Sequence, residues 1–553
     1  MDKRRNRVFI YGFVLFGLLF MGALFKIQIL DYDFYKQKAE TQQRRFIKVA
    51  ADRGDIISSD GKILATSLNT YSIYVNPRLF KDRAALSSLL GEEVKIDNSE
   101  KYFVWVRRKL NQAIAQQVKE AELPGVGIIV EKKRIYPYRQ LASQVLGFTG
   151  IDNDGLAGLE LSFDNYLKAK EGWIKTYTDP IGFEFLQAKR ERVDPAEEGF
   201  NLVITIDHKL QYIAERELEK TIKKYYAKSG TVLVMDIKNG DILALASKPD
   251  FDPNRYYEFD NKLWISRACS VYEPGSTFKL ITTAAAFEEG VADEETRLKA
   301  LEKITVGGKT VTNAHDIDWP GRMTTVTFML EQSTNTGAVQ LGKMLGKEKF
   351  YKHIKKFGFG DKTEFGLPGE SAGILKKPNG WWKPDIAMIS FGQGIAVTPV
   401  QLIRAIAALG NDGKLINPRI IKRIESRDGS YIKSLPANNL GQATSKKTAR
   451  RMLELMRRVI ENGTGKLAAL KQYKVGGKTG TAQKVIIGRG KYYEDRYIAS
   501  FIGVAPIENP RFAALVIIDD PKGKIWGGTT AGPVFKRLVE ETLRFYNIRP
   551  NSL

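Results

Sequence analysis

Residues 273–289 read EPGSTFKLITTAAAFEE. Pro274 and Gly275 interrupt the chain, and the apolar run behind them predicts a helix with Ser276 at its N-terminus. Side chains three positions apart share one helix face, so Lys279 is expected one turn from the Ser276 hydroxyl. A lysine can take a serine proton there if burial or nearby cations lower its pKa. The stretch therefore predicts an activated serine nucleophile.

Ser276 also has a simpler interpretation, because serine after Pro-Gly is a common helix cap. The S-x-x-K pattern is weak alone, since it recurs at Ser59 and Ser430. Only Ser276 has an S-x-N 57 residues later (333 − 276) and the single K-T-G of the chain 202 residues later (478 − 276). These are Ser333-Thr-Asn335 and Lys478-Thr-Gly. The combination favours a serine acyl-transfer site over a cap.

The two later motifs predict different local structures. Ser333 and Asn335 follow a helical stretch and are expected in a loop, where local turn bonding is their ordinary role. Residues 475–483 read VGGKTGTAQ, typical of a strand whose backbone approaches a substrate or another segment closely. There Lys478 could hold a carboxylate, and the Thr481 backbone N–H could join that of the nucleophile as an oxyanion hole. A hinge in a structural strand is the alternative for the glycines.

Composition limits the function classes. With 553 residues the chain can form two or three domains, and its net charge of +23 suggests an anionic neighbour. No nucleic-acid-binding motif accompanies that charge, so a nucleic-acid partner is not predicted. Cys269 is the only cysteine, which excludes a disulfide framework. The three histidines, His208, His315 and His353, lack ligand spacing, so neither a metal site, a cofactor nor a histidine-based triad is predicted.

The N-terminus predicts a membrane anchor. Four basic residues at positions 3, 4, 5 and 7 precede an uncharged apolar run from Val8 to Phe25, long enough to span a bilayer. A cleaved signal peptide is the alternative, but the run is long and no small-x-small site follows it. The basic residues should stay in the cytoplasm, which places the chain from about residue 30 onward outside the membrane.

The rest of the chain predicts an α+β protein. A hairpin is expected at 231–247 around the turn Asn239-Gly240, with further strands near 474–486, 497–504 and 511–518. Helices are expected at 208–224 and 532–546 and through most of the interval between the strands. Strands at both ends of a domain imply an antiparallel sheet flanked by helices. The predicted domains are the tail and transmembrane anchor at 1–30, an elongated mixed pedestal at 45–200, and a catalytic domain at 201–548.

Together these motifs resemble those of class B penicillin-binding proteins, over nearly the whole chain. The three catalytic motifs form the signature set of penicillin-interacting serine enzymes. The supporting segments are YEPGSTFK at 272–279, SFGQG at 390–394, TPVQ at 398–401, GKTGTAQ at 477–483 and GLE at 158–160. One departure lies at Ser58-Ser59, where the family usually has Asp-Arg, which weakens the expectation of a local salt bridge.

The resemblance implies a reaction and its residues. Ser276 would be the acylated nucleophile, Lys279 its general base, and Ser333 with Asn335 the proton-relay and substrate-orienting pair. The reaction would be D,D-transpeptidation, in which the serine attacks the D-Ala-D-Ala bond of a peptidoglycan stem peptide. The acyl group would then pass to an amine of a neighbouring strand.

The motif strand would bind the substrate. Lys478 and Thr479 would hold its carboxylate beside Gly480, and Thr481 would line the oxyanion hole. β-Lactams would acylate the same serine. No glycosyltransferase module fits before the hairpin, so the resemblance implies a polytopic membrane glycosyltransferase and other division proteins as partners.

The ending Ala531-Gly-Pro-Val-Phe535 and the short pedestal are most similar to the division-specific type, which implies a single-pass protein of the bacterial cytoplasmic membrane at the division site. Three alternatives remain: an elongation-type transpeptidase, a serine β-lactamase or β-lactam sensor, and a catalytically silent division scaffold.

Overall fold

The computed structural model describes residues 3–96, 100–177, 191–486 and 491–550. Its contacts divide the chain into two compact units. The first unit comprises Met1–Asp52, Tyr71–Glu131 and Ala169–Glu198, and the second comprises Arg53–Thr70, Lys132–Lys168 and Gly199–Leu553. The chain passes between the units several times, so each contains segments that are distant in sequence.

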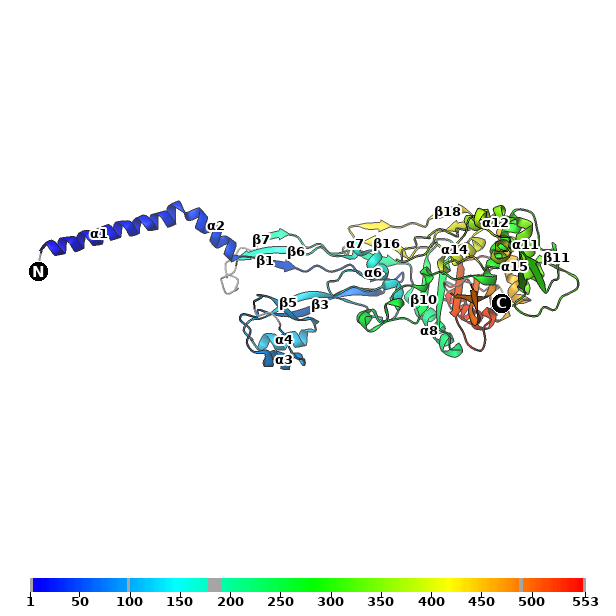
Figure 1. The fold of residues 1–553 in the computed structure, drawn as a ribbon, viewed down its shortest axis with the longest axis horizontal. Coiled ribbons are helices and arrows are strands. Elements are labelled where there is room, and N and C mark those ends of the chain that lie inside the picture. The colour runs from blue at the N-terminus through cyan, green and yellow to red at the C-terminus, as the bar shows by residue number, and fades with distance from the viewer. Residues whose placement is uncertain (1–2, 97–99, 178–190, 487–490, 551–553) are drawn as a thin grey trace. The chain divides into compact units, whose positions relative to one another are not determined.

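The first unit begins with helices. These are α1 (Lys3–Phe25), the π-helical turn η1 (Lys26–Leu30) and α2 (Tyr32–Gln43) (Figure 1). Within the described residues, the stretch Asn6–Leu30 alone is long and apolar enough to cross a membrane, with 25 residues and a mean hydropathy of 2.4. None of it is buried inside the protein. A helix of this length matches the hydrocarbon thickness of a bilayer, as predicted for a single-pass anchor.

Two small sheets make up the rest of the first unit. One is antiparallel and has the order β1 (Arg44–Val49), β6 (Gly172–Tyr177), β7 (Glu191–Asp194). In the other, the end of β3 (Ile63–Val75) lies between β4 (Val104–Leu110) and β5 (Val126–Ile135). Helices α3 (Arg83–Leu90) and α4 (Gln112–Glu120) accompany this second sheet and supply Leu86 and Val118 to its core.

The second unit is built on a five-stranded antiparallel sheet. Its order is β10 (Ile242–Lys248), β9 (Ser229–Asp236), β21 (Phe512–Asp519), β20 (Lys491–Ala505), β19 (Gly476–Ile486). The hairpin β9–β10 turns at Gly240, whose positive φ of 80° suits glycine. As predicted, the first strands of the domain pair with the last, because β9 lies beside β21 (Figure 1).

Helices cover both faces of this sheet. Alternate residues of β21 point to opposite sides, so Ala514 and Val516 pack with α8 (His208–Tyr225) and α17 (Gly532–Phe545). Leu515 belongs to the larger core on the other side, with α14 (Pro399–Gly410), α9 (Lys279–Glu288) and α15 (Lys446–Glu461). The predicted α+β architecture is therefore confirmed.

The remaining elements lie around this framework. The helices are α5 (Ser143–Leu146), α6 (Gly158–Ser162), α7 (Asp164–Leu167), α10 (Val326–Glu331), α11 (Asn335–Leu345), α12 (Lys347–Lys356), α13 (Asp385–Ser390) and α16 (Gly527–Thr530). Short 3₁₀ turns are η2 (Pro253–Glu258), η3 (Asn261–Leu263), η4 (Arg267–Cys269), η5 (Gly275–Phe278), η6 (Pro378–Gly380) and η7 (Lys466–Ala468). The strands are β2 (Ile56–Ile57), β8 (Asn201–Ile204), β11 (Arg297–Lys299), β12 (Lys303–Val306), β13 (Lys309–Thr312), β14 (Met323–Thr325), β15 (Lys414–Ile416), β16 (Ile421–Glu425), β17 (Ile432–Ser434) and β18 (Asn439–Gln442).

The interval between the two halves of the sheet holds more β-structure than predicted. The hairpin β12–β13 turns at Gly307 and Gly308, which have φ of 56° and 82°. Two glycines flanked by alternating Ile, Val and Thr residues are a hairpin signal, and the expectation of mostly helices was wrong here because it passed over this turn.

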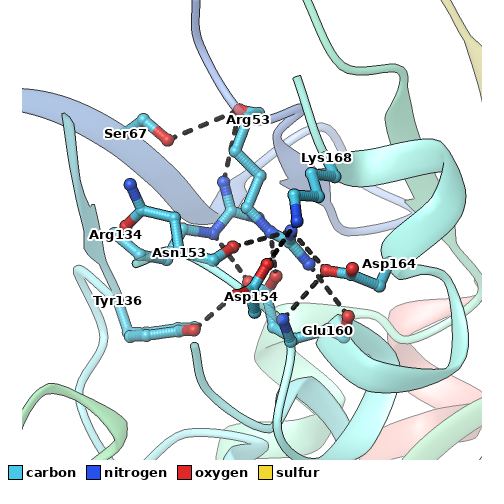
Figure 2. Close-up of polar contacts among 10 residues, drawn as sticks. Arg53, Ser67, Arg134, Tyr136, Asn153, Asp154, Glu160, Asp164 and Lys168 are labelled. Atoms are coloured by element: carbon cyan, nitrogen blue, oxygen red, sulfur yellow. Dashed lines mark hydrogen bonds and ion pairs between the residues drawn. The ribbon is translucent and has the colours of Figure 1, made fainter. Parts of the chain in front are cut away.

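A buried ionic network joins segments of the second unit (Figure 2). Glu160 on α6 is fully buried and accepts hydrogen bonds from Arg53 Nε and Arg134 Nε, both at 2.6 Å. Arg53 Nη1 also donates to Asp164 Oδ1 at 2.6 Å, and Tyr136 Oη donates to Glu160 at 3.2 Å. The GLE segment of the sequence thus provides the acidic centre that pairs two buried arginines.

Charge balance explains why the arginines tolerate burial. Burial alone lowers the pKa of Arg53, but the Glu160 charge and hydrogen bonds to Asp164 and Glu160 outweigh it and raise that pKa above its ordinary value. Removing one partner of such a network leaves an uncompensated buried charge, which costs far more than losing a surface ion pair.

Replacing Glu160 by Ala is expected to destabilise the protein by about 3–5 kcal/mol, because Arg53 and Arg134 lose their shared counter-ion. The measurement is urea unfolding of the full chain in detergent. Lys168→Ala is the matched control: it breaks the exposed pair with Asp154 and should cost less than about 1 kcal/mol. Equal losses in the two variants would contradict this account.

Candidate active site

Ser276 lies in the 3₁₀ turn η5, directly before α9. The backbone around it is tightly enclosed. Gly275 has a positive φ of 57°, and its N–H donates to the Gly392 carbonyl at 3.0 Å. A Cβ added at Gly275 would lie 3.1 Å from the Ala482 Cβ, and one at Gly392 would lie 2.2 Å from the Gly275 oxygen. The backbone before Ser276 is therefore fixed between β19 and the turn at Gly392.

Lys279 begins α9 and is fully buried. Its Nζ donates to the Ser333 carbonyl at 2.6 Å and to Asn335 Oδ1 at 2.8 Å. Ser333 lies between α10 and α11 with a positive φ of 58°, and Asn335 Nδ2 donates to the Thr312 carbonyl at 2.9 Å. The lysine amine is held by the loop that joins the two helices.

Lys478 on β19 reaches the same loop from the other side. Its side chain is fully buried, and its Nζ donates to Ser333 Oγ at 2.7 Å. Ser333 Oγ is also 3.4 Å from Lys279 Nζ. The Ser333 hydroxyl therefore connects the two lysine amines, and the structure brings the three sequence motifs together in the second unit.

Both amines are desolvated without a counter-charge. Burial lowers the pKa of Lys478 to about 7. Burial, and then the charge of Lys478, lower the pKa of Lys279 well below its usual range. Throughout the described part of the chain, neither lysine forms an ion pair with an acidic side chain. A neutral Lys279 amine can donate its two N–H bonds to Ser333 and Asn335 and keep a lone pair for a proton.

The hydrogen-bond partners of the Lys279 amine do not include the Ser276 hydroxyl among the described residues. The amine is bonded to Ser333 and Asn335 instead. Hydrogen bonds of catalytic groups are often long in the absence of substrate and tighten when it binds. The one-turn spacing from Ser276 to Lys279 is nevertheless as the sequence predicts.

The strand β19 forms one edge of the central sheet, so alternate backbone groups face away from β20. Thr479 Oγ1 lies 2.8 Å from Thr464 Oγ1, and Thr481 Oγ1 accepts from the Gly527 N–H at 3.2 Å. A Cβ at Gly480 would lie 2.3 Å from Ser500 Oγ and 2.9 Å from Thr277 Cγ2. Gly480 thus permits close protein packing between β19 and the serine turn.

Two cavities of about 490 Å³ and 380 Å³ meet at Ser276, and both are also lined by Thr481 and Trp526. Asn335 lines the larger cavity and Ser333 the smaller. Neither cavity has an aspartate or glutamate among its described lining residues. Ser276 therefore faces a groove with no carboxylate among its described lining residues.

His315 is a cavity residue that the sequence did not single out. It lines the smaller cavity, and its ring centroid lies 6.0 Å from that of Trp526. Burial lowers the pKa of His315, and any positive charge on Lys279 or Lys478 adds to this effect. No motif spacing in the sequence predicts that His315 lies at the site, because this residue comes from the segment that follows β13.

The other two histidines lie outside these cavities. His353 Nε2 is 2.7 Å from a carboxylate oxygen of Glu289, and His208 Nδ1 is hydrogen-bonded to Asp60. Asp60 and Asp207 with His208 are the one group of described residues whose three ligand atoms lie within 4.8 Å of one another. Ser58 Oγ also donates to Asp60 Oδ1 at 2.7 Å, so Asp60 is held here by hydrogen bonds from Ser58 and to the His208 ring.

Comparisons with known proteins agree with this geometry. A family model described as the penicillin binding protein transpeptidase domain matches residues 230–540. A second model, the penicillin-binding protein dimerisation domain, matches residues 48–204. The two matches include the buried Glu160 network and all three catalytic motifs.

Full-length relatives are also similar. Stage V sporulation protein D of Bacillus subtilis is 35% identical over 100% of this chain and 87% of its own length. The probable peptidoglycan D,D-transpeptidase PenA of Neisseria gonorrhoeae is 33% identical over 98% and 92%. The peptidoglycan D,D-transpeptidase FtsI of Escherichia coli is 30% identical over the same shares, 98% and 92%.

The fold is likewise similar to that of a solved structure. Penicillin binding protein 3 of Mycobacterium tuberculosis, complexed with aztreonam, superposes with a TM-score of 0.72 at 26% identity, covering 92% of this chain and 98% of that one. A serine, two buried lysines and an edge strand surround one groove, and both domain models match the sequence. The chain belongs to the class B penicillin-binding proteins, a family of serine acyltransferases.

Proposed function

We propose that the chain is a peptidoglycan D,D-transpeptidase that cross-links stem peptides through an ester on Ser276. One observation carries the proposal: Ser333 connects two fully buried lysines, Lys279 and Lys478, and neither has a carboxylate partner among the described residues. Such an arrangement keeps a lysine uncharged and basic at neutral pH. The relatives PenA and FtsI carry the same activity in their names.

In the first half of the reaction, Lys279 takes the Ser276 proton while the oxygen attacks the carbonyl between the two terminal D-alanines. The backbone N–H groups of Ser276 and Thr481 stabilise the tetrahedral oxyanion. Ser333 relays that proton from Lys279 to the leaving nitrogen, the C–N bond breaks, and D-alanine departs with a free amine. The peptide remains as an ester on Ser276.

In the second half, an amine of a neighbouring stem peptide attacks the ester. Lys279 accepts the proton from that amine, a new amide bond forms as the ester C–O bond breaks, and Lys279 returns the proton to the Ser276 oxygen. Asn335 orients the peptide, while Lys478 and Thr479 hold the terminal carboxylate beside Gly480 before it leaves.

A β-lactam mimics the D-Ala-D-Ala end and acylates the same serine. The described cavity residues favour a transpeptidase over a β-lactamase, because a lactamase needs a base that activates water, and neither cavity has an acidic lining residue there. The intact serine and both lysines likewise disfavour a catalytically silent scaffold.

The cellular setting is part of the proposal. Residues 1–30 hold the protein in the bacterial cytoplasmic membrane, residues 45–200 form the pedestal, and residues 201–548 form the catalytic domain outside the membrane. Polymerised strands come from a polytopic membrane glycosyltransferase, and the protein works with this and other division proteins at the septum. The name and 30% identity of FtsI support this role.

A second candidate role is cell-wall synthesis during sporulation. The observation that favours it is the 35% identity with stage V sporulation protein D over the whole chain. Both roles use the same reaction, so they differ in time and place of action. An elongation role has no specific support in these comparisons.

Ser276→Ala is expected to lower the rate of acylation by a fluorescent penicillin by about 10³-fold or more, because the nucleophile is lost. Mass spectrometry of the modified peptide should locate the label on Ser276 in the parent protein. Ser430→Ala is the matched control, since Ser430 begins another S-x-x-K, and its label should be unchanged. Full labelling of the Ser276 variant would exclude this nucleophile.

The acylation rate should fall at acidic pH. Lys279 must be uncharged to act as a base, so activity is lost as the pH drops through its lowered pKa. In Lys478→Gln, the loss of the nearby positive charge should raise that pKa and move the acid limb to higher pH.

The measurement is the second-order rate constant of penicillin acylation between about pH 4 and 9. Lys466→Gln is the control, because this exposed cation lines the smaller cavity but is screened by solvent. An acid limb that stays in place in Lys478→Gln would contradict the proposed coupling.

Depletion in the source bacterium distinguishes the roles. A septal enzyme should yield long undivided cells that a parent copy rescues and a Ser276→Ala copy does not. Rounded cells would indicate an elongation role, and normal growth with defective spores would indicate the sporulation role. Rescue by the Ser276→Ala copy would favour a scaffold.

A further inference from the structure

A surface beside the larger cavity has no role in the reaction described above. The strand β13 lines that cavity from Lys309 to Thr312. At the tip of its hairpin, a Cβ added at Gly307 would lie 2.6 Å from the Lys383 Cβ and 2.8 Å from Pro384 Cδ. The hairpin tip therefore packs directly on the segment before α13.

Trp382 stands on this segment with 77% of its surface exposed. It is the most exposed of the seven tryptophans, all of which lie in the described residues. Its backbone is nevertheless fixed, because its N–H donates to Asp385 Oδ2 at 3.0 Å. Its neighbour Trp381 is buried against Phe350 on α12, with its Nε1 donating to the Lys376 carbonyl at 2.8 Å. A large apolar ring is thus held in solvent on a firmly anchored turn.

The charge around this tryptophan is positive. Asp385 neutralises Lys376 at 3.4 Å. In the described part of the chain, no acidic side chain pairs with Lys309, Lys377 or Lys383, and all three are exposed. We call Lys309, Lys377, Trp382 and Lys383 the tryptophan ridge. It comprises an exposed indole and two cations on one segment, with Lys309 on the hairpin whose tip packs on that segment.

We propose that the tryptophan ridge binds the glycan strand that carries the stem peptides. An indole face packs well against the apolar face of a sugar ring, and the lysines complement the carboxylates that the strand and its stems bear. Because Lys309 lines the groove and Lys383 contacts its hairpin, one strand can cover the ridge while its stem peptide enters toward Ser276. This inference rests on the proposed function and adds a polymer-binding surface to it.

A second binding surface has a kinetic purpose. Contacts remote from the reacting bond raise the effective concentration of the stem peptide at the groove. A small β-lactam covers only the groove and gains nothing from the ridge. Substitutions in the ridge should therefore separate polymer cross-linking from β-lactam acylation.

The test uses the full chain in detergent micelles and the triple variant Lys377→Glu, Trp382→Ala, Lys383→Glu. The matched control is Tyr226→Ala with Lys224→Glu, which changes an exposed aromatic residue and a lysine at the end of α8. The probe is a soluble, uncross-linked peptidoglycan strand with pentapeptide stems. Binding is measured by equilibrium titration, and acylation by a fluorescent penicillin is measured in parallel.

Each exposed ionic contact is worth a factor of about two to five, so the triple variant should bind the strand about tenfold or more weakly. Its acylation rate should equal that of the parent, which also shows that it folds. The control should bind normally. Strands with amidated carboxylates should bind the parent more weakly than unmodified strands.

Parent-like strand binding by the triple variant would overturn the inference. So would tighter binding of the parent to anionic lipid vesicles, lost in the same variant, because the ridge would then be a membrane surface. If the parent is not acylated at Ser276, the proposed function fails, and the titration still decides whether the ridge binds the strand.

Discussion

The burial of two lysine amines around one serine hydroxyl is the constraint on which this structure depends. Lys279 and Lys478 lie on either side of Ser333 and have no buried counter-ion in the described residues. Taking two like charges out of water is costly, so the fold can hold this arrangement only if at least one amine gives up its proton. The same requirement provides a base at neutral pH. The cost of burying the amines and the proposed chemistry therefore favour the same uncharged state, and perturbed pKa values of this kind are common at functional sites.

Three distant segments must meet to build that arrangement, and small residues let them do so. The serine turn packs on β19 at Gly480, where any larger side chain would meet Ser500 and Thr277. Ser333 adopts a left-handed conformation that directs its carbonyl and hydroxyl toward the lysines. Because β9 pairs with β21, the sheet beneath the site closes only when both ends of the domain are present. The buried Glu160 network gives the second unit another junction between segments distant in sequence.

The sequence predicted the parts of the molecule that short patterns specify. The central hairpin, the edge strand and the helix after Ser276 follow from turn residues and hydrophobic periodicity, and all are confirmed. The glycines of β19 were expected to let the backbone approach a substrate or another segment, and in the structure Gly477 and Gly480 face Phe501 and Ser500. The local sequence pattern shows that another group must come close to the backbone at these glycines, but it does not show which group this is.

Other features depend on contacts between segments and could not be read from one stretch. His315 enters the groove from a loop with no motif, and the pairing of Arg53 with Glu160 spans more than 100 residues of sequence. In the sequence, Trp382 cannot be distinguished from an ordinary buried apolar residue. The structure shows that its neighbour Trp381 is buried and that Trp382 is exposed. The β12–β13 hairpin differs, because its Gly-Gly turn was visible in the sequence and was overlooked.

The central claim is that Lys279 is uncharged in the resting protein, and its ionisation can be measured directly. The full chain, labelled with ¹³C at the lysine ε-carbons, is titrated by nuclear magnetic resonance, and the Lys279 signal is assigned by its loss in Lys279→Met. The account predicts a Lys279 signal that titrates well below the ordinary lysine pKa of 10.5, because the amine is buried and lies near Lys478. A Lys279 signal that remains that of a cation until near pH 10.5 would contradict it.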